Sequence, residues 1–289
     1  MTQIVGSLDE ISARYRALFV DLWGCLHNGR EAFPEAVAAL QRYKEGGGAV
    51  VLLTNAPRHR MAVAQQLAGL GVPETCWDTI ATSGDSARAA MFRGAVGQKV
   101  YFIGIDFDLT FFDPIRIVTD PVAIERVPLE QAEGIVCTGP FDAHADPAVL
   151  RPQLLYAKQK GLKLLCANPD VVVDRGERRE YCAGAIAALY TEMGGESLYF
   201  GKPHPPIYDL ARRRLSEFAD VADHEILCIG DGIATDIRGA LGEDLDSVFI
   251  TGGLAREETK TGRDPERAAL DAFLSREMAS PTYAMGFLR

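Results

Sequence analysis

The feature that most constrains the fold is a repeated alternation of short apolar runs with longer amphipathic segments. The runs at 17–20 (ALFV), 49–53 (AVVLL) and 225–229 (EILCI) lack the polar alternation of a strand with one wet face. Strands this apolar are covered by helices on both sides, which is typical of an open parallel sheet. A predicted helix at 34–48 begins with proline and ends with glycines. The sequence therefore predicts an α/β fold with a doubly wound, Rossmann-like parallel sheet core.

The middle of the chain differs in pattern and predicts a second domain. The core pattern includes strands at 79–83, 198–200 and 247–251 and helices at 59–71, 85–94, 206–218 and 237–241. Between 97 and 181, the strand-like segments KVYFIG, EGIVCTG and KLLCANPD accompany one clear helix, 146–161. We predict that residues 97–181 form a smaller α/β domain inserted into a core made of residues 1–96 and 182–289.

Composition excludes several classes of partner. Thirty basic and forty acidic residues give a net charge of −10, and no basic run with interleaved aromatics indicates nucleic-acid binding. No apolar run approaches the roughly 18 residues that cross a bilayer, so we expect a cytoplasmic protein without membrane contact. The six cysteines lack paired spacing, which favours buried, reduced thiols over disulfides or zinc.

Polar residues follow four of the predicted strands directly. Asp21 follows ALFV, and Thr54 and Asn55 follow AVVLL. Lys202 comes after LYF, and Asp231 comes after EILCI. A single carboxylate after a strand is more often a cap or loop residue. In an open parallel sheet, however, the carboxyl ends of the strands form the ligand crevice, so we expect these side chains to converge.

Together these residues are suited to phosphoryl chemistry. Asp21, Asp231 and Asp236, the last in GDGIATD, offer hard oxygens that suit Mg²⁺. Thr54 and Asn55 offer hydroxyl, amide and backbone donors for phosphoryl oxygens, and the lysine adds a positive charge. The combination predicts a site for an anionic, three-oxygen group, with Asp21 placed to attack it.

The segments FVDLWG, LLTNAP, GKPH and IGDGIATD resemble, in order, the four motifs of the haloacid dehalogenase (HAD) superfamily of aspartate-nucleophile phosphatases. The insert between the second and third motifs ends in CANPD, and CAGA follows it, which is similar to the class IIA branch with its C2-type α/β cap. That branch includes sugar-phosphate, nitrophenyl-phosphate and pyridoxal-phosphate phosphatases. The resemblance covers nearly the whole chain. It implies a Mg²⁺-dependent phosphatase of a small phosphorylated metabolite, and it allows a homodimer, since relatives often dimerise through the cap.

The resemblance also assigns roles to residues. Asp21 becomes the nucleophile that forms an aspartyl-phosphate, Thr54 and Lys202 hold and neutralise the phosphoryl group, and Asn55 is a weaker phosphate ligand. The implied Mg²⁺ ligands are the Asp21 carboxylate, the backbone carbonyl of Trp23 and the Asp231 carboxylate, with Asp236 as a further ligand or a neighbour of the ligands.

Trp23 departs from the pattern of the family, in which an aspartate at this position protonates the leaving oxygen and deprotonates the attacking water. An indole can do neither. A positioned general acid or base contributes about 10²- to 10⁴-fold, so we predict weak turnover or selectivity for activated leaving groups. The Trp23 side chain either fills space beneath the cap or forms a stacking wall for a substrate.

Two residues are candidates for the missing role, and one alternative function stays open. His27 lies six residues after Asp21, and because a histidine ordinarily titrates near neutral pH, it is the nearest substitute acid or base, or else it packs in its loop. Asp170, in CANPD, either faces the substrate from the cap or forms a turn. The alternative function is a phosphometabolite-binding, catalytically impaired HAD-like protein.

Overall fold

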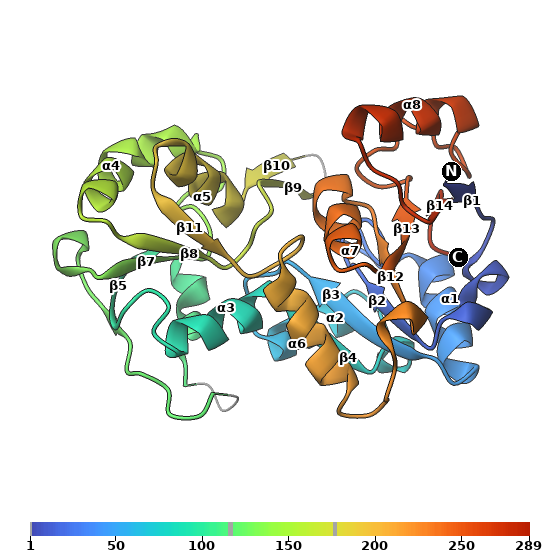
Figure 1. Ribbon diagram of the computed structural model, residues 1–289, viewed down its shortest axis with the longest axis horizontal. Helices are drawn as coiled ribbons and strands as arrows, with labels where there is room; N and C mark the ends of the chain where they lie inside the picture. Colours follow the sequence, from blue (N-terminus) through green and yellow to red (C-terminus); the bar gives the residue numbers. More distant parts are fainter. Residues whose placement is uncertain (1, 115–117, 176–177) are drawn as a thin grey trace. The chain divides into compact units, whose positions relative to one another are not determined.

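The computed structural model describes residues 2–114, 118–175 and 178–289. The chain forms two compact units (Figure 1). Unit 1 consists of Met1–Thr54, Val63–Ala81 and Lys202–Arg289, and unit 2 consists of Asn55–Ala62 and Thr82–Gly201. None of the described helices is long and apolar enough to cross a bilayer. The six cysteines are free and buried.

A seven-stranded sheet forms the centre of unit 1. Its order is β1-β14-β13-β12-β2-β3-β4, with bounds Gln3–Ile4 (β1), Tyr283–Met285 (β14), Asp246–Ile250 (β13), Ile226–Gly230 (β12), Ala17–Val20 (β2), Ala49–Thr54 (β3) and Thr79–Thr82 (β4). Neighbouring strands run parallel, and Phe19 lies opposite both Val51 and Cys228. The central strands β2, β3 and β12 are buried along their whole length, as their apolar sequences predict.

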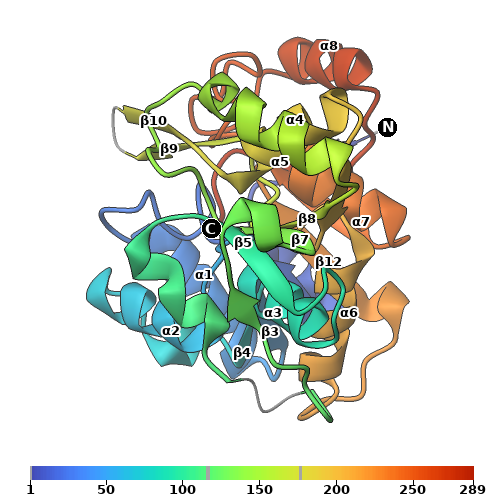
Figure 2. The same ribbon diagram turned by 90° about the vertical axis from the view of Figure 1, so that its left-hand side faces the viewer.

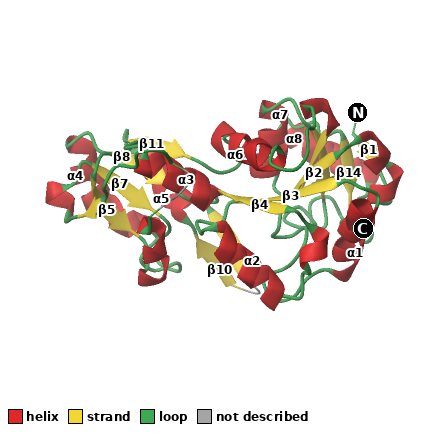
Figure 3. Cartoon of the chain, turned by 90° about the horizontal axis from the view of Figure 1, so that it is seen from below, coloured by secondary structure: helices red, strands yellow, loops and turns green. Residues whose placement is uncertain are grey.

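Helices cover this sheet on both faces. They are α1 (Pro34–Glu45), α2 (Arg60–Gly69, which begins in unit 2), α6 (Pro205–Leu215), α7 (Arg238–Gly242) and α8 (Arg267–Glu277). Figure 3 shows α6, α7 and α8 on one side of the sheet and α1 on the other. The apolar stripe of α6, including Ile207 and Ala211, packs on Phe19 and Val51. Each face of the sheet is therefore shielded from water.

Unit 2 has a sheet of its own, of five parallel strands. The order is β11-β8-β7-β5-β6, with bounds Glu196–Tyr199 (β11), Lys163–Cys166 (β8), Gly134–Cys137 (β7), Lys99–Ile103 (β5) and Glu125–Arg126 (β6). Alternate residues face opposite layers. Ile135 and Leu164 pack with helices α4 (Arg151–Gln159) and α5 (Ala183–Glu192), and Val136 packs with α3 (Ser83–Phe92) (Figure 2). A separate antiparallel pair joins β9 (Val172–Arg175) to β10 (Arg178–Tyr181).

The predicted fold class is confirmed, but the domain limits differ from the predicted 1–96, 97–181 and 182–289. Helix α3 and strand β11, both expected in the core, belong to unit 2. Met91 of α3 is buried against Val136, and Leu198 of β11 pairs with Leu165 of β8. An apolar pattern shows that an element is buried, but it does not show which of two parallel sheets covers it. The sequence pattern alone therefore does not assign such an element to one sheet or the other.

Candidate active site

Three adjacent strands of unit 1 bring polar side chains to one edge of the sheet. Asp21 follows β2, Thr54 ends β3, and Asp231 follows β12, and these strands lie side by side in the order β12-β2-β3. All three side chains are buried. Because the strands are parallel, their carboxyl ends share an edge, and the structure brings these residues together as the sequence predicts.

Lys202 reaches the same place by a different route from the one predicted. The strand that precedes it, β11, belongs to the sheet of unit 2, so Lys202 does not extend a core strand. It lies instead at the start of the last segment of unit 1, just before α6. Lys202 is only 2% exposed, and its ammonium donates to Asp21 Oδ1 at 2.5 Å and to Asp236 Oδ1 at 2.7 Å.

The charges of this cluster are strongly coupled. Burial by itself lowers the pKa of Lys202, but Asp21 and Asp236 more than offset that effect and raise the pKa above its ordinary value. The lysine therefore stays charged. Burial, together with the charges of Asp21 and Asp236, raises the pKa of Asp231 well above its ordinary range. Three buried carboxylates facing one ammonium leave an excess of negative charge that a divalent cation would offset.

Two loops close on the Asp231 carboxylate. The backbone N–H of Leu254 donates to Asp231 Oδ2 at 3.0 Å. Gly24 has φ +78°, and a Cβ at this position would lie 2.1 Å from the same oxygen. A Cβ at Gly253 would lie 2.0 Å from it. Only glycine allows the backbone to approach this closely, so both positions hold the carboxylate in place.

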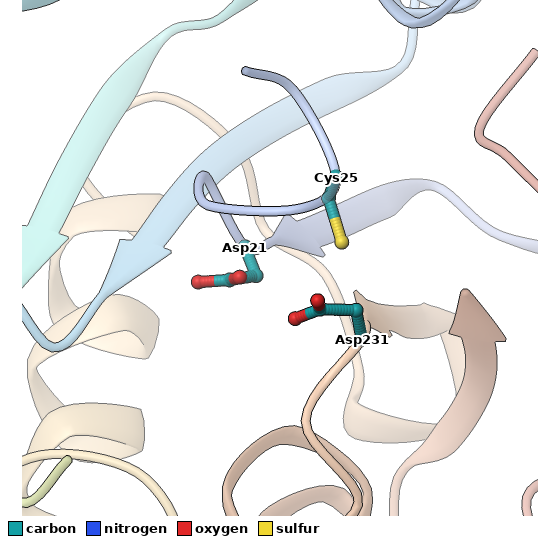
Figure 4. A group of neighbouring side chains, drawn as sticks. All are labelled: Asp21, Cys25 and Asp231. Carbon is teal, nitrogen blue, oxygen red and sulfur yellow. The ribbon is translucent and has the colours of Figure 1, made fainter. Parts of the chain in front are cut away.

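The residues present fit a hard divalent cation. Among the described residues, Asp21, Cys25 and Asp231 each offer a ligand atom, and these atoms lie within 4.8 Å of one another (Figure 4). Carboxylate oxygens are the ligands that Mg²⁺ prefers. Burial and the neighbouring Asp231 and Asp21 charges raise the pKa of Cys25 well above its ordinary value, so its neutral thiol is a poor partner for Mg²⁺. The two aspartates are therefore the side chains that would hold Mg²⁺.

Asp236, predicted as a metal ligand or a neighbour of the ligands, lies outside that group of described residues. Its Oδ1 accepts from Lys202, and its Oδ2 accepts from the backbone of Gly232 at 3.1 Å and from the hydroxyl of Thr235 at 3.3 Å. A turn of π-helix, Ile233–Ile237, places the carboxylate there. These contacts favour the neighbouring position, in which Asp236 orients Lys202.

The indole of Trp23 is held between His27 and Gly29. Its ring meets the imidazole edge to face, with centroids 5.3 Å apart, and a Cβ on Gly29 would lie 2.4 Å from the indole. Gly29 has φ +81°, and its N–H donates to His27 Nδ1 at 3.0 Å. His27 is 2% exposed, and burial lowers its pKa to about 4. A neutral, buried imidazole that accepts from its own loop has a packing role, and its predicted role as acid or base stays a prediction.

Asn55 and Asp170 contact each other within unit 2. Asn55 Nδ2 donates to Asp170 Oδ1 at 2.8 Å, and the Asp170 N–H donates to Asn168 Oδ1 at 3.0 Å. A Cβ at Gly184, in CAGA, would lie 2.1 Å from the carbonyl oxygen of Pro169, so this glycine lets α5 pack on the CANPD loop. The predicted phosphate contact of Asn55 and the substrate contact of Asp170 stay predictions.

Comparison with known proteins agrees with this geometry. The family model described as haloacid dehalogenase-like hydrolase matches residues 18–113, and a second HAD-hydrolase-like model matches residues 199–273. A crystal structure from Brucella suis, described as a hydrolase of the haloacid dehalogenase-like family, is 36% identical, covers 99% of this chain and 100% of that chain, and superposes with a TM-score of 0.84. The chain belongs to the haloacid dehalogenase-like hydrolase family.

Named relatives of this HAD-like hydrolase are phosphatases. The 5'-nucleotidase YutF of Bacillus subtilis is 23% identical over 256 residues, covering 86% of this chain and 91% of that protein. The D-glycerol 3-phosphate phosphatase of Mycobacterium tuberculosis is 25% identical over 279 residues, covering 96% of this chain and 70% of that protein. The predicted superfamily and the predicted enzyme class, a HAD-type phosphoric monoester hydrolase, are confirmed.

Sequence reasoning missed three residues around Asp231. The sequence predicts only that Cys25 is a buried thiol, because no spacing rule links one cysteine to a carboxylate more than 200 positions away. Gly253 and Leu254 follow the predicted strand 247–251, in the segment TGGL. A pair of glycines directly after a buried parallel strand indicates close backbone approach at the ligand edge, and this signal was available.

Proposed function

We propose that this HAD-like hydrolase is a Mg²⁺-dependent phosphatase that acts on a small phosphorylated metabolite through an aspartyl-phosphate on Asp21. The observation that carries the proposal is the buried Lys202 ammonium, which bridges Asp21 and Asp236 beside Asp231 at the carboxyl edge of the sheet. A binding site for a phosphoryl group alone would not need a carboxylate at its centre, because like charges repel. A nucleophilic carboxylate does need neighbours that neutralise it and the incoming anion.

Each residue of the site has a separate role in the proposed reaction. Lys202 fixes Asp21 Oδ1 in one orientation and lowers the repulsion between the carboxylate and a phosphoryl oxygen. Asp236 holds Lys202 from the other side and keeps it charged. Thr54, on the neighbouring strand, offers a hydroxyl at the same edge. Bound to Asp21, Asp231 and the Trp23 carbonyl, Mg²⁺ would supply Lewis-acid stabilisation of the phosphoryl oxygens.

Trp23 supports a restriction on the leaving group. The position two residues after the nucleophile holds an indole that neither gives nor takes a proton usefully. His27, the nearest candidate substitute, is buried and packs against that indole. We infer that the enzyme turns over esters whose leaving groups depart as stable anions faster than simple alkyl phosphates. The named activities of the relatives, on nucleotides and on glycerol phosphate, support a small phosphorylated metabolite as the substrate class.

The test is steady-state hydrolysis of a phosphate-ester series graded by leaving-group basicity, with and without Mg²⁺. We expect activity that needs Mg²⁺, is lost in Asp21→Asn, and falls steeply as the leaving group becomes more basic. Equal turnover of alkyl and nitrophenyl phosphates would show that another residue supplies the proton, and His27→Gln is then the variant to measure. Activity no higher than that of Asp21→Asn would favour the alternative, a phosphometabolite-binding protein. The predicted cytoplasmic location, the homodimer and the role of unit 2 as a cap stay predictions.

A further inference from the structure

The thiol of Cys25 is aimed at the carboxylates of the site. Cys25 lies four residues after Asp21 in the loop that follows β2, and its side chain is 1% exposed. Its Sγ and one carboxylate oxygen each from Asp21 and Asp231 lie within 4.8 Å of one another. Figure 4 shows the Cys25 thiol, from the loop after β2, directed toward the side chain of Asp231, whose carboxylate extends sideways in the direction of Asp21. The three side chains therefore surround one small space.

Three other buried thiols have a carbonyl partner, whereas Cys228, like Cys25, has no hydrogen bond among the described residues but lies outside the group formed with Asp21 and Asp231. Cys76 Sγ donates to the carbonyl of Val37 at 3.7 Å, and Cys166 Sγ donates to the carbonyl of Asn168 at 3.2 Å. Within the described part of the chain, Cys25 Sγ makes no hydrogen bond. A fully buried polar atom without a hydrogen-bond partner, facing two carboxylates, indicates a ligand that it would bind.

We propose that Cys25 gives this site a second metal-binding mode, in which a thiophilic divalent cation, Zn²⁺ or Co²⁺, is held by Cys25 Sγ and by one oxygen each of Asp21 and Asp231. The Mg²⁺ mode of the proposed function uses the same two aspartates without the thiol. Sulfur and carboxylate together suit Zn²⁺ and Co²⁺, whereas Mg²⁺ takes oxygen ligands. The fourth position is left for water or a phosphoryl oxygen.

The binding step is a ligand exchange without change of oxidation state. The S–H bond of Cys25 breaks, the sulfur lone pair forms the bond to the cation, and the proton passes to bulk water. No oxidant or reductant takes part. The cation then occupies the oxygens of Asp21 and Asp231 that would hold Mg²⁺, so it excludes Mg²⁺. This second mode competes with the Mg²⁺ mode, and Cys25, which has no role in the proposed phosphoryl chemistry, strengthens it.

The absorption spectrum of bound Co²⁺ shows directly whether a thiolate is bonded to the metal. Full-length protein titrated with Co²⁺ is expected to develop a thiolate-to-metal charge-transfer band in the near ultraviolet together with the intense visible bands of four-coordinate cobalt. Zn²⁺ added afterwards removes both. The test variants are Cys25→Ser and Cys25→Ala, and the matched control is Cys76→Ser, which alters an equally buried thiol of the same unit far from the group of ligands.

The expected result is that wild type and Cys76→Ser give the charge-transfer band, that both Cys25 variants lack it, and that the Cys25 variants bind Zn²⁺ at least about tenfold more weakly. Circular dichroism verifies the fold of each variant. A missing band in wild type overturns the proposal whatever the variants do, and so does a band that persists in a folded Cys25 variant. The test of the proposed function is separate. If the charge-transfer band appears but Mg²⁺-dependent hydrolysis is absent, the thiolate metal site is supported and the proposed phosphatase activity is overturned. If hydrolysis is present but the band is absent, only the thiolate metal site is overturned.

Discussion

At the scale of single residues, the side chain of Trp23 decides what chemistry is available beside the nucleophile. The indole packs edge to face against His27, and it lies so close to Gly29 that a Cβ at that position would clash with it. The left-handed backbone of Gly29 is what lets the loop fold so close. The position therefore holds an aromatic surface and offers no titratable group.

Restoring a carboxylate at this position is expected to broaden the substrate range. We predict that Trp23→Asp raises kcat for alkyl phosphates by about 10²-fold, while nitrophenyl phosphate, whose leaving group needs no proton, changes by less than about tenfold. The measurement is the slope of log kcat against leaving-group pKa, which is expected to flatten in the variant.

Trp23→Asn is the matched control for this prediction, because it removes the same indole and adds a side chain of the same size that cannot titrate. Both variants lose the contacts with His27 and Gly29, so they share any loss of stability or of loop order. A gain with asparagine equal to that with aspartate would mean that relief of crowding, and not acid or base catalysis, was the cause.

At the scale of elements, the segment after β13 holds the predicted metal ligand Asp231. A chain of buried hydroxyls stabilises this segment: Thr259 and Thr261 are bonded at 2.8 Å, and Thr261 donates to Thr251 at 2.8 Å. The backbone of Thr251 is bonded to β14 through Met285 at 2.9 Å. Because the segment is tied at both points, the Gly253–Leu254 peptide can hold the Asp231 carboxylate rigidly.

A methyl group at Gly253 is expected to displace that carboxylate. Its Cβ would lie 2.0 Å from Asp231 Oδ2, so the side chain must rotate or the segment must shift. We predict that Gly253→Ala weakens Mg²⁺ binding by about 10- to 100-fold, as measured by isothermal titration calorimetry. Gly262→Ala is the control, since a Cβ at that position meets no atom within 4 Å. Unchanged Mg²⁺ affinity in Gly253→Ala would exclude Asp231 as a ligand held by this segment.

How far the sequence predicts this molecule depends on whether the decisive contacts are local. The strands β2, β3 and β12 and the edge shared by Asp21, Thr54 and Asp231 were predictable, because they follow from short apolar runs and from the geometry of a parallel sheet. The strand that pairs with β11 was not predictable, because an apolar residue such as Leu198 suits a buried strand of either sheet. The short distance between Cys25 and Asp231 was not predictable either, because it depends on how two loops fold in space.

At the scale of the whole molecule, each of the two compact units has its own sheet and its own buried apolar residues. Unit 1 buries its apolar residues around β2, β3 and β12, and unit 2 buries its own around β7 and β8. The candidate metal ligands Asp21 and Asp231 both belong to unit 1. A cation that binds only the folded form of these two residues therefore stabilises the unit that contains them, and its effect on the other unit measures how far the two unfold together.

We predict that Mg²⁺ slows amide hydrogen exchange in unit 1, around β2 and β12, and leaves β7 and β8 of unit 2 unchanged. At a concentration about 100 times the dissociation constant, the ion contributes about 2.7 kcal/mol to the unfolding free energy of the unit that binds it. Exchange measured by mass spectrometry on the full chain resolves the two sheets, because their peptides do not overlap. Asp231→Asn is the control and is expected to lose the Mg²⁺ effect in unit 1. Equal protection of both sheets would mean that the chain opens as one cooperative body, and protection of unit 2 alone would place the cation away from Asp21 and Asp231.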